Sequence, residues 1–508
     1  MNESSSNLNA DASAKHVSAN HASTNPKQLQ PLTRIIACTA MTSLYLLLLF
    51  SLGLGYYADS AQYVEMHFRR DPLYPIYLWL FRTLLGNGTV YLYAAAIVQL
   101  LLNCLASDYF ARHLSAMLHR GRRYYLLAMA AQAALQLLTV AGSRSHLFLA
   151  GSILTESLTL PIFSIFFIKL AETMLEAPNA PLWNRNCIQS LLLALLAALT
   201  RGQLIAFAGV WALVMLGRIL RQVRSLHREG KPAAKKAVCS LLTLACLLLT
   251  FLLLLSSGGR LYRFVFYGKG IRTEKMSYTD MVMSGTVLYV SREEDASYIF
   301  DPTARELFLR MNRLLEDKHA TLDWAPKGLN ARTLHFEQNI EVLRYDADED
   351  IINQYLLQEA GIEDYITRNE YENYYSGLIW KAILPHRLIP WMGNFLRVLR
   401  AGLIRSIGIF HPRANWLFGL LYILTIIQLM AHSIRTRHSV ADSASRIPSD
   451  LITHDRLMLL TLLCILLNCA CISLVMPCEQ RYCIYGFVPF YLLQADNLLT
   501  MMRKIRAS

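Results

Sequence analysis

Charged residues are scarce in this chain, and so are the motifs of metal and nucleotide chemistry. Only 17% of the 508 residues are Asp, Glu, Lys or Arg, whereas soluble domains contain about 25%. No cysteine lies between residues 247 and 463, and neither CxxC nor any other zinc spacing occurs. HExxH, the Walker A motif and GxSxG are absent as well. The sequence therefore argues against a soluble enzyme with a dedicated metal or nucleotide site.

Long apolar runs take the place of the missing charges. Hydrophobic residues make up 54% of the chain, the mean hydropathy is +0.31, and several runs approach the ~20 apolar residues that cross a bilayer. We predict an all-α polytopic membrane protein with about ten transmembrane helices. The predicted spans are residues 35–55, 89–107, 124–141, 147–173, 187–200, 204–217, 237–257, 414–433, 456–476 and 482–501.

The polar N-terminal segment and the first apolar run are interpreted together. Residues 1–34 are rich in Ser, Asn and Ala, which predicts a disordered tail. The run at 35–55 is longer than an ordinary signal-peptide core and starts further into the chain. We therefore interpret it as a signal-anchor rather than as a cleaved signal.

Basic residues collect between the apolar runs, as they do in the cytoplasmic loops of membrane proteins. We attribute the net charge of +13 to this topology rather than to nucleic-acid binding. Ten spans with both termini in the cytoplasm place all four basic clusters on the inner side. The clusters consist of Arg112, Arg120, Arg122 and Arg123, of Arg218, Arg221, Arg224, Arg228, Lys231, Lys235 and Lys236, of Arg435 and Arg437, and of Arg503, Lys504 and Arg506.

The stretch 187–217 tests the number of spans. As one helix it would be ~46 Å long at 1.5 Å per residue, which exceeds the ~30 Å hydrocarbon core of a bilayer. Two short helices that turn at residues 200–203 avoid this problem and keep the next basic loop inside. Arg201 then lies at a turn below the outer surface, where it needs an acid or a phosphate as its partner.

Two regions outside the spans carry the polar sequence. The first outer loop, residues 56–88, contains an aromatic stretch at 73–81 that is too short to cross and is predicted to lie along the membrane surface. The composition becomes polar at residues 256–259. From there we predict a small, mostly helical extracytoplasmic domain.

The predicted domain contains helices at 303–317 and 349–360 and an interfacial helix within 378–411. The predicted organisation of the chain is a tail at 1–34, an N-terminal transmembrane domain at 35–257, the extracytoplasmic domain at 258–413 and the C-terminal transmembrane helices at 414–508.

Two acids are candidates for chemistry. Asp59 lies just beyond the outer end of the first span, with Tyr63 one turn further on. A carboxylate there can act as a general base when a partly enclosed site holds it; the alternative is an ordinary solvated loop acid. Glu156 falls about two turns inside the fourth span, where a carboxylate is costly and is a functional candidate by default. The alternative for Glu156 is a structural ion pair with an arginine such as Arg201.

Arginines mark two further places on the predicted outer face. Arg69 and Arg70 in the first outer loop suit lipid phosphates, which guanidinium groups bind bidentately; the alternative is general anchoring at the interface. Glu479-Gln-Arg481-Tyr482 forms a tight outer turn between the last two predicted spans. It would place a guanidinium and a phenol on the same outer side as Asp59. The alternative is an ordinary polar turn with an interface tyrosine.

In this order, these pieces resemble the GT-C membrane glycosyltransferases. In particular, they resemble the bacterial members related to the protein O-mannosyltransferases and the lipid A aminoarabinose transferase. The resemblance rests on an Asp and a Tyr-Pro-rich helix in the first outer loop, on Leu154-Thr-Glu-Ser-Leu158, on a short hairpin with Arg at its turn, and on the late Glu-x-Arg-Tyr. It covers about residues 35–260 and 410–500, and residues 258–400 have no counterpart in it.

The resemblance implies an inverting sugar transfer on the outer face, with a sugar-bearing polyprenyl phosphate as the donor. Asp59 would be the base that deprotonates the acceptor hydroxyl. Arg201, Arg481 and Tyr482 would hold the donor phosphate and stabilise its growing charge, with Arg69 and Arg70 as further phosphate candidates. Glu156 would orient a sugar or an arginine.

The first outer loop departs from the pattern of these relatives in two ways. Many relatives carry two adjacent acids where this chain has Asp59 followed by Ser60. They often show His-x-Pro before the surface helix, where this chain has Asp71-Pro72-Leu-Tyr-Pro75. Glu65 and Asp71 therefore remain alternatives for the base.

The predicted location is the cell inner membrane, in envelope glycan or glycolipid synthesis. The implied partners are the lipid-linked donor, membrane lipids and a lipid, glycan or protein acceptor. No cofactor is indicated, and metal dependence stays open because members of the group differ. A transporter or flippase of lipid-linked glycans is an alternative that predicts repeats or charges across the mid-membrane. A non-catalytic scaffold is another, and it would tolerate loss of Asp59, Glu156 and Arg481.

Overall fold

The chain folds into helices joined by short connections. The computed structural model describes residues 30–142, 146–230, 232–268, 278–408, 415–441 and 449–507. Every regular element within these ranges is a helix, and the recorded β-contact is a single bridge between Gly55 and Ser152. The predicted all-helical class is confirmed. Most of the predicted disordered tail lies outside the described residues, and the first helix begins at Pro31, ahead of the predicted residue 35.

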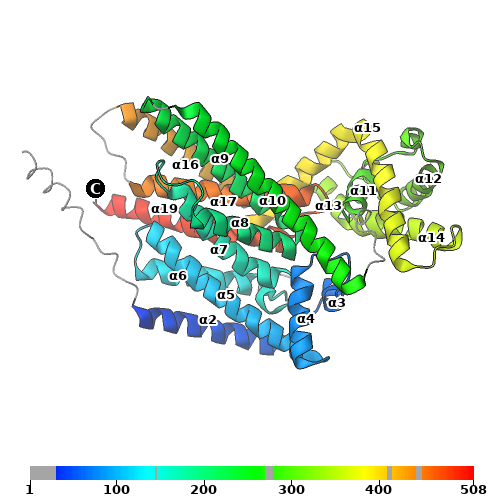
Figure 1. Cartoon of the computed structure of the whole chain (residues 1–508), viewed down its shortest axis with the longest axis horizontal. Helices are drawn as coiled ribbons and strands as arrows, with labels where there is room; N and C mark the ends of the chain where they lie inside the picture. Colours follow the sequence, from blue (N-terminus) through cyan, green and yellow to red (C-terminus); the bar gives the residue numbers. More distant parts are fainter. Residues whose placement is uncertain are drawn as a thin grey trace, which may run out of the picture.

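Long apolar helices form a bundle that makes up the larger part of the molecule (Figure 1). Eight of the described helices are long and apolar enough to cross a membrane, which indicates a multi-pass membrane protein. The most apolar of them is the helix Ala233–Tyr267, and only 17% of its most apolar stretch is buried in the protein. An apolar surface of this kind suits lipid rather than water. The eight are α2 (Pro31–Leu52), α5 (Thr89–Met117), α6 (Arg122–Gly142), α7 (Glu156–Leu175), α9 (Ala206–Arg228), α10 (Ala233–Tyr267), α16 (Asn415–Ala441) and α17 (Ser449–Ser473).

Two of the ten predicted spans fall short of the length and composition of a membrane-crossing helix. One corresponds to α8 (Arg185–Thr200), whose 16 residues reach only ~24 Å. The other corresponds to α19 (Phe487–Ala507), whose apolar part is interrupted by Gln494, Asp496 and Asn497 and ends at a basic terminus. Both helices still run along the bundle (Figure 1), where α8 packs against α7 and α19 packs against α6 and α17.

The predicted turn between two short helices is present. The helix α8 ends at Thr200, and the 3-10 helix η2 (Gly202–Ile205) leads into α9. Arg201 between them has extended backbone angles, which breaks the helix. The second helix of the hairpin is longer than predicted, because α9 continues through the basic residues to Arg228.

The two ends of the bundle differ in character (Figure 1). The basic connections between α5 and α6 and between α9 and α10 lie at the end where α2 begins and α19 finishes. The opposite end carries α3 (Ala58–Val64), α4 (Leu73–Leu85) and residues 278–408. The helix α4 is the predicted surface helix, and it runs across the bundle rather than along it.

The helix α10 continues past residues 256–259, where the change of composition predicts a domain boundary. It stays helical to Tyr267. Its last turns contact the loop after α3, because the hydroxyls of Tyr262 and Tyr267 both donate to the Met66 carbonyl. A membrane-spanning helix thus extends beyond its apolar part and supports the first outer loop.

Residues 278–408 form a separate helical unit at this end, which we call the peripheral domain. Its helices are α11 (Tyr278–Leu288), α12 (Pro302–Asp317), α13 (Leu329–Glu341), the π-helix η5 (Val342–Asp350), α14 (Ile351–Gln358) and α15 (Tyr365–Ile407). The helices predicted at 303–317 and 349–360 correspond to α12 and α14. Phe308 and Phe336 are fully buried in its core, with the ring of Tyr289 4.8 Å from that of Phe336.

The long helix α15 connects the peripheral domain to the bundle. It bends at Arg387, whose backbone angles are not helical and whose Nε donates to Asp295 at 2.8 Å. After the bend, α15 packs against α17 (Figure 1). The interfacial helix predicted within 378–411 falls on α15, where Leu388 and Ile389 are exposed next to the bend; its place at the membrane interface stays a prediction.

Asp348, in the π-helix η5, gives the peripheral domain a pH-dependent stability. The hydroxyls of Ser284 and Ser376 lie 3.1 and 3.0 Å from its Oδ1. Burial, reinforced by the charge of Glu372, raises the pKa of Asp348 well above its usual range. The folded protein keeps a proton that the unfolded chain loses above about pH 4. The free energy of unfolding therefore falls as the pH rises from there towards the raised pKa.

We expect Asp348→Asn to reduce this decline, since Asn keeps the shape and cannot ionise. Asp348→Ala leaves two buried hydroxyls without their acceptor and should lower the free energy of unfolding by about 1–3 kcal/mol. Thermal unfolding of the purified protein between about pH 5 and pH 8 measures both effects. The same slope in the wild type and the Asn variant would contradict the assignment.

Candidate functional site

The first outer loop is fastened to the segment that precedes α7. The amide of Ile153 donates to the Gly55 carbonyl at 2.8 Å, and the Ser60 hydroxyl donates to the Ile153 carbonyl at 2.7 Å. Gly55 lies so close to this segment that a Cβ at position 55 would overlap the side chain of Ser152. These contacts place Asp59, in the first turn of α3, near the N-terminal end of α7.

Two arginines from distant parts of the sequence hold Asp59. Arg70 Nη2 lies 2.6 Å from Oδ1, and Arg481 Nη2 lies 3.3 Å from Oδ2. Arg70 also donates to Gln62 at 2.8 Å and to the Tyr63 hydroxyl at 3.4 Å. Burial by itself raises the pKa of Asp59, but the charges of Arg70 and Arg481 outweigh it and hold the pKa below its ordinary value. Asp59 is therefore ionised at neutral pH, as a general base must be.

The ring of Tyr482 contacts two guanidinium groups. The Cζ atoms of Arg201 and Arg481 are 3.9 and 4.5 Å from its centroid. Stacking on the electron-rich face of one ring keeps these two like charges close together. Arg481 also bonds to the Tyr482 hydroxyl and donates through Nε to Glu479 at 2.9 Å. The Glu479 side chain is 54% exposed, so an anionic ligand can replace it on Arg481.

Glu156 and Arg201 form a buried ion pair. Arg201 Nη1 lies 2.5 Å from Glu156 Oε1 and donates to the Thr155 hydroxyl at 3.1 Å. The prediction that Glu156 lies two turns inside a span is wrong, because residues 147–155 are not part of the helix and Glu156 is the first residue of α7. Glu156 is 1% exposed, and the positive end of the helix dipole also favours its charge. The structure thus contains the ion pair that the sequence offers as the alternative for Glu156. Since the Arg201 side chain is still 16% exposed, the pair leaves part of that guanidinium open to a ligand.

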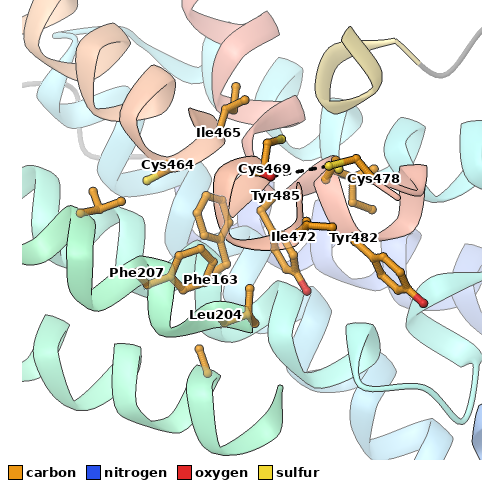
Figure 2. Packing of buried hydrophobic residues seen from close by; sticks show 14 of the residues in the cluster. Phe163, Leu204, Phe207, Cys464, Ile465, Cys469, Ile472, Cys478, Tyr482 and Tyr485 are labelled. Carbon is orange, nitrogen blue, oxygen red and sulfur yellow. Dashed lines mark hydrogen bonds between the residues drawn. The ribbon is translucent and has the colours of Figure 1, made fainter. Parts of the chain in front are cut away.

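Buried aromatic side chains pack against the turn before α19, which carries Arg481. Tyr482 and Tyr485 leave one short helical stretch, α18 (Gln480–Cys483) followed by η7 (Ile484–Gly486), and extend in the same direction (Figure 2). The Tyr485 ring lies 5.7 Å from the rings of Phe163 and Phe207, and its hydroxyl is 2.7 Å from that of Thr159. This packing explains how a turn of a few residues can hold Arg481 in place.

Asp71 ties the first outer loop to the turn between α8 and α9. Its Oδ2 accepts a hydrogen bond of 2.7 Å from the amide of Gly202, the residue after Arg201. Burial raises the pKa of Asp71 to about 6, against the opposing effects of that hydrogen bond and of Arg70. A carboxyl group with such a pKa is well suited to accept a proton near neutrality. Asp71 therefore stays an alternative for the base.

The structure brings most of the residues singled out in the sequence into one group, which we call the polar cluster. Its members come from the first outer loop, the start of α7, the α8–α9 turn and the turn before α19. They are Asp59, Tyr63, Arg70, Glu156, Arg201, Glu479, Arg481 and Tyr482. Arg69 does not join this group, because Glu349 and Glu372 of the peripheral domain bind its guanidinium. Glu65 points to the exterior.

Two contributors to the site were not anticipated from the sequence. Thr155 is uncharged, and the signal in the sequence is its place directly before Glu156, where its hydroxyl accepts from Arg201. The Gly202 amide cannot be recognised from residue type at all. Its role depends on the backbone that follows Arg201 and on the approach of Asp71 from another loop.

The polar cluster offers donors that suit an anion. It gathers three guanidiniums from three separate segments, and three carboxylates lie against them. Guanidinium groups suit phosphate because they offer two parallel donors. Across the described ranges of the chain, no three His, Cys, Asp or Glu side chains are grouped so that they could hold a metal ion.

Comparison with known proteins leaves the site as the main source of functional information. The chain matches no family model, no curated protein and no solved structure.

Proposed function

We propose that this chain is an integral-membrane, inverting glycosyltransferase of the GT-C type. It moves a sugar from a polyprenyl-phosphate donor to a lipid, glycan or protein acceptor. The observation that carries the proposal is the convergence of Arg70, Arg201 and Arg481 around one ionised carboxylate, Asp59, at one end of an apolar bundle. The arginines can bind the phosphate of a membrane-bound donor, and the carboxylate can take the proton of the acceptor hydroxyl.

The proposed mechanism follows from the positions of these charges. Asp59 takes the proton of the acceptor hydroxyl, and the oxygen attacks the anomeric carbon from the side opposite the phosphate. The bond between that carbon and the phosphate oxygen breaks, so the configuration inverts and polyprenyl phosphate leaves. Arg201 and Arg481 stabilise the charge that grows on the leaving phosphate, which is where preorganised donors contribute most to the rate.

The two glutamates of the polar cluster have different roles in this proposal. Glu479 is exposed and gives up Arg481 to the phosphate. Glu156 is buried and keeps Arg201 oriented by accepting from one edge of its guanidinium.

The proposal includes a topology. The basic end of the bundle faces the cytoplasm together with both termini, in keeping with the charge rule for membrane proteins. The polar cluster and the peripheral domain then lie on the outer face of the cell inner membrane. The helices α8 and α19 complete ten crossings, and the shortness of α8 keeps Arg201 below the outer surface.

Release of free polyprenyl phosphate tests the proposal. The purified protein is incubated in detergent with a panel of polyprenyl-phosphate sugars and candidate acceptors. We expect the wild type to turn over one donor, and Arg481→Ala to lower kcat/KM by about 10²–10³-fold, as loss of one oxyanion donor does. Arg310→Ala, which removes an exposed arginine of the peripheral domain, is the matched control and should keep full activity.

Two results would overturn the proposal. The protein would be a transporter if it binds lipid-linked sugars tightly without turnover and moves them from one leaflet of a vesicle membrane to the other. If no donor is bound or turned over, the protein is a scaffold whose partner binds elsewhere.

A further inference from the structure

Three consecutive charged residues of the first outer loop each bind a different part of the molecule. Arg69 pairs with two carboxylates of the peripheral domain. Arg70 pairs with Asp59 in the polar cluster. Asp71 accepts from the backbone of the turn between α8 and α9. A segment of three residues thus links the peripheral domain, the candidate base and the turn that carries Arg201.

The contact of Arg69 with the peripheral domain is buried and directional. Its Nη1 lies 3.0 Å from Glu349 Oε1, and its Nη2 lies 3.0 Å from Glu372 Oε2. The side chain of Arg69 is 12% exposed and that of Glu372 is fully buried. The amides of Asn353 and Asn369 donate to the same oxygen of Glu372 at 3.2 and 3.3 Å. The peripheral domain therefore holds an oriented carboxylate at the place where the loop arrives.

Neighbouring residues of the loop contact α10 and the α15 helix of the peripheral domain. The Phe68 ring lies 5.7 Å from that of Tyr267 in α10 and 5.8 Å from that of Tyr365 in α15. Met66 has a φ of +58°, which a residue with a side chain seldom adopts, and its carbonyl accepts from Tyr267 at 2.6 Å. Such a backbone persists where the surroundings determine it, and here the surroundings are α10 and the peripheral domain.

We propose that Arg69 is a positioning residue through which the peripheral domain holds Arg70, and with it Asp59, in place within the polar cluster. Adjacent Cα atoms are only ~3.8 Å apart, so any shift of Arg69 passes directly to Arg70 and Asp71. This gives the peripheral domain a role in the site from which it is separate in sequence. The consequence for sugar transfer rests on the proposed function, whereas the coupling of domain and loop does not.

Hydrogen exchange of the full-length protein in detergent tests the coupling. Arg69→Gln keeps most of the side-chain length and removes the charge. We expect the amides of residues 58–71 to exchange about tenfold faster. The exchange rate follows the free energy of local opening, and a small loss of local stability is enough for a tenfold increase. Arg310→Gln, which removes an arginine from a surface ion pair of the same domain, is the control and should leave residues 58–71 unchanged.

A folded Arg69→Gln protein with unchanged exchange over residues 58–71 would overturn the inference. If that variant does not fold, Glu349→Gln decides, because it removes one of the two carboxylates and keeps the other. Faster exchange in the loop then supports the inference, and unchanged exchange rejects it.

The readout in sugar transfer is separate. A misplacement of about 1 Å far from the chemistry costs up to about 10²-fold, so Arg69→Gln should lower kcat by up to that factor with a smaller change in KM. Arg69→Lys should recover part of the loss. If the wild type transfers no sugar, the proposed function fails, while hydrogen exchange still decides the coupling.

Discussion

Replacing Asp59 with Asn is expected to lower the rate of sugar transfer by about 10²–10⁴-fold, which is the contribution of a well-placed general base. Asn keeps the shape of the side chain and one acceptor for Arg70, so the loop should stay folded. It cannot take the proton of the acceptor hydroxyl. The effect should appear in kcat more than in donor KM, because the phosphate is held by arginines. Release of polyprenyl phosphate under single-turnover conditions measures it.

Two further variants make this prediction specific. Glu65→Gln changes an exposed acid of the same loop and should leave the rate close to that of the wild type. Asp71→Asn distinguishes the alternative base. Full activity in Asp59→Asn combined with an inactive Asp71→Asn would transfer the role to Asp71, whose pKa of about 6 suits proton transfer near neutrality.

Breaking the buried pair of Glu156 and Arg201 is expected to destabilise the bundle strongly. Glu156→Met leaves the Arg201 charge without its acid, and removing one partner of a buried ion pair costs about 3–5 kcal/mol. The double variant Glu156→Met with Arg201→Met removes both charges and keeps similar volume. It should lose much less stability than the single variant, since apolar replacement of a whole buried pair is often nearly neutral.

Unfolding of the purified protein by increasing dodecyl sulfate in mixed micelles compares these variants. An exposed pair of the peripheral domain provides the control: Asp323→Asn removes the partner of Arg292, and both side chains are about half exposed at 52% and 53%. It should change the free energy of unfolding little. Losses that simply add in the double variant would show that Glu156 and Arg201 stabilise the bundle independently of each other.

The elements of the fold were largely predictable because bilayer physics acts on local sequence. An apolar run of about 20 residues must be helical in lipid, where no water can satisfy the backbone. The break at Arg201 was predictable for the same reason, since one helix over 187–217 would be too long. The ends of helices were less predictable. The helix α10 runs on to Tyr267 because tyrosines of its last turns bond to the first outer loop, a contact that composition does not indicate.

Much of the polar cluster was also predictable from single residues. A charge within or next to an apolar run is costly, so Asp59, Glu156, Arg201 and Arg481 are conspicuous in the sequence. Their pairing is predictable only for Glu156 and Arg201, since the sequence places Glu156 in the fourth predicted span and Arg201 at the turn after the fifth. The sequence makes both Arg69 and Arg70 phosphate candidates, because they are arginines in the predicted outer loop. The structure gives these neighbours different partners, since consecutive side chains of the loop point to different sides.

The sequence by itself determined that this is a helical membrane protein, that its chain breaks at Arg201, and which few charges lie in or next to its apolar runs. The reason is that transfer of apolar and charged groups into lipid is a property of short stretches of chain. Only the tertiary structure decided which acid meets which arginine. Asp59 meets a residue 422 positions away in Arg481, and Arg69 meets one 303 positions away in Glu372. Contacts over such separations follow from the packing of helices against one another, which no local pattern encodes.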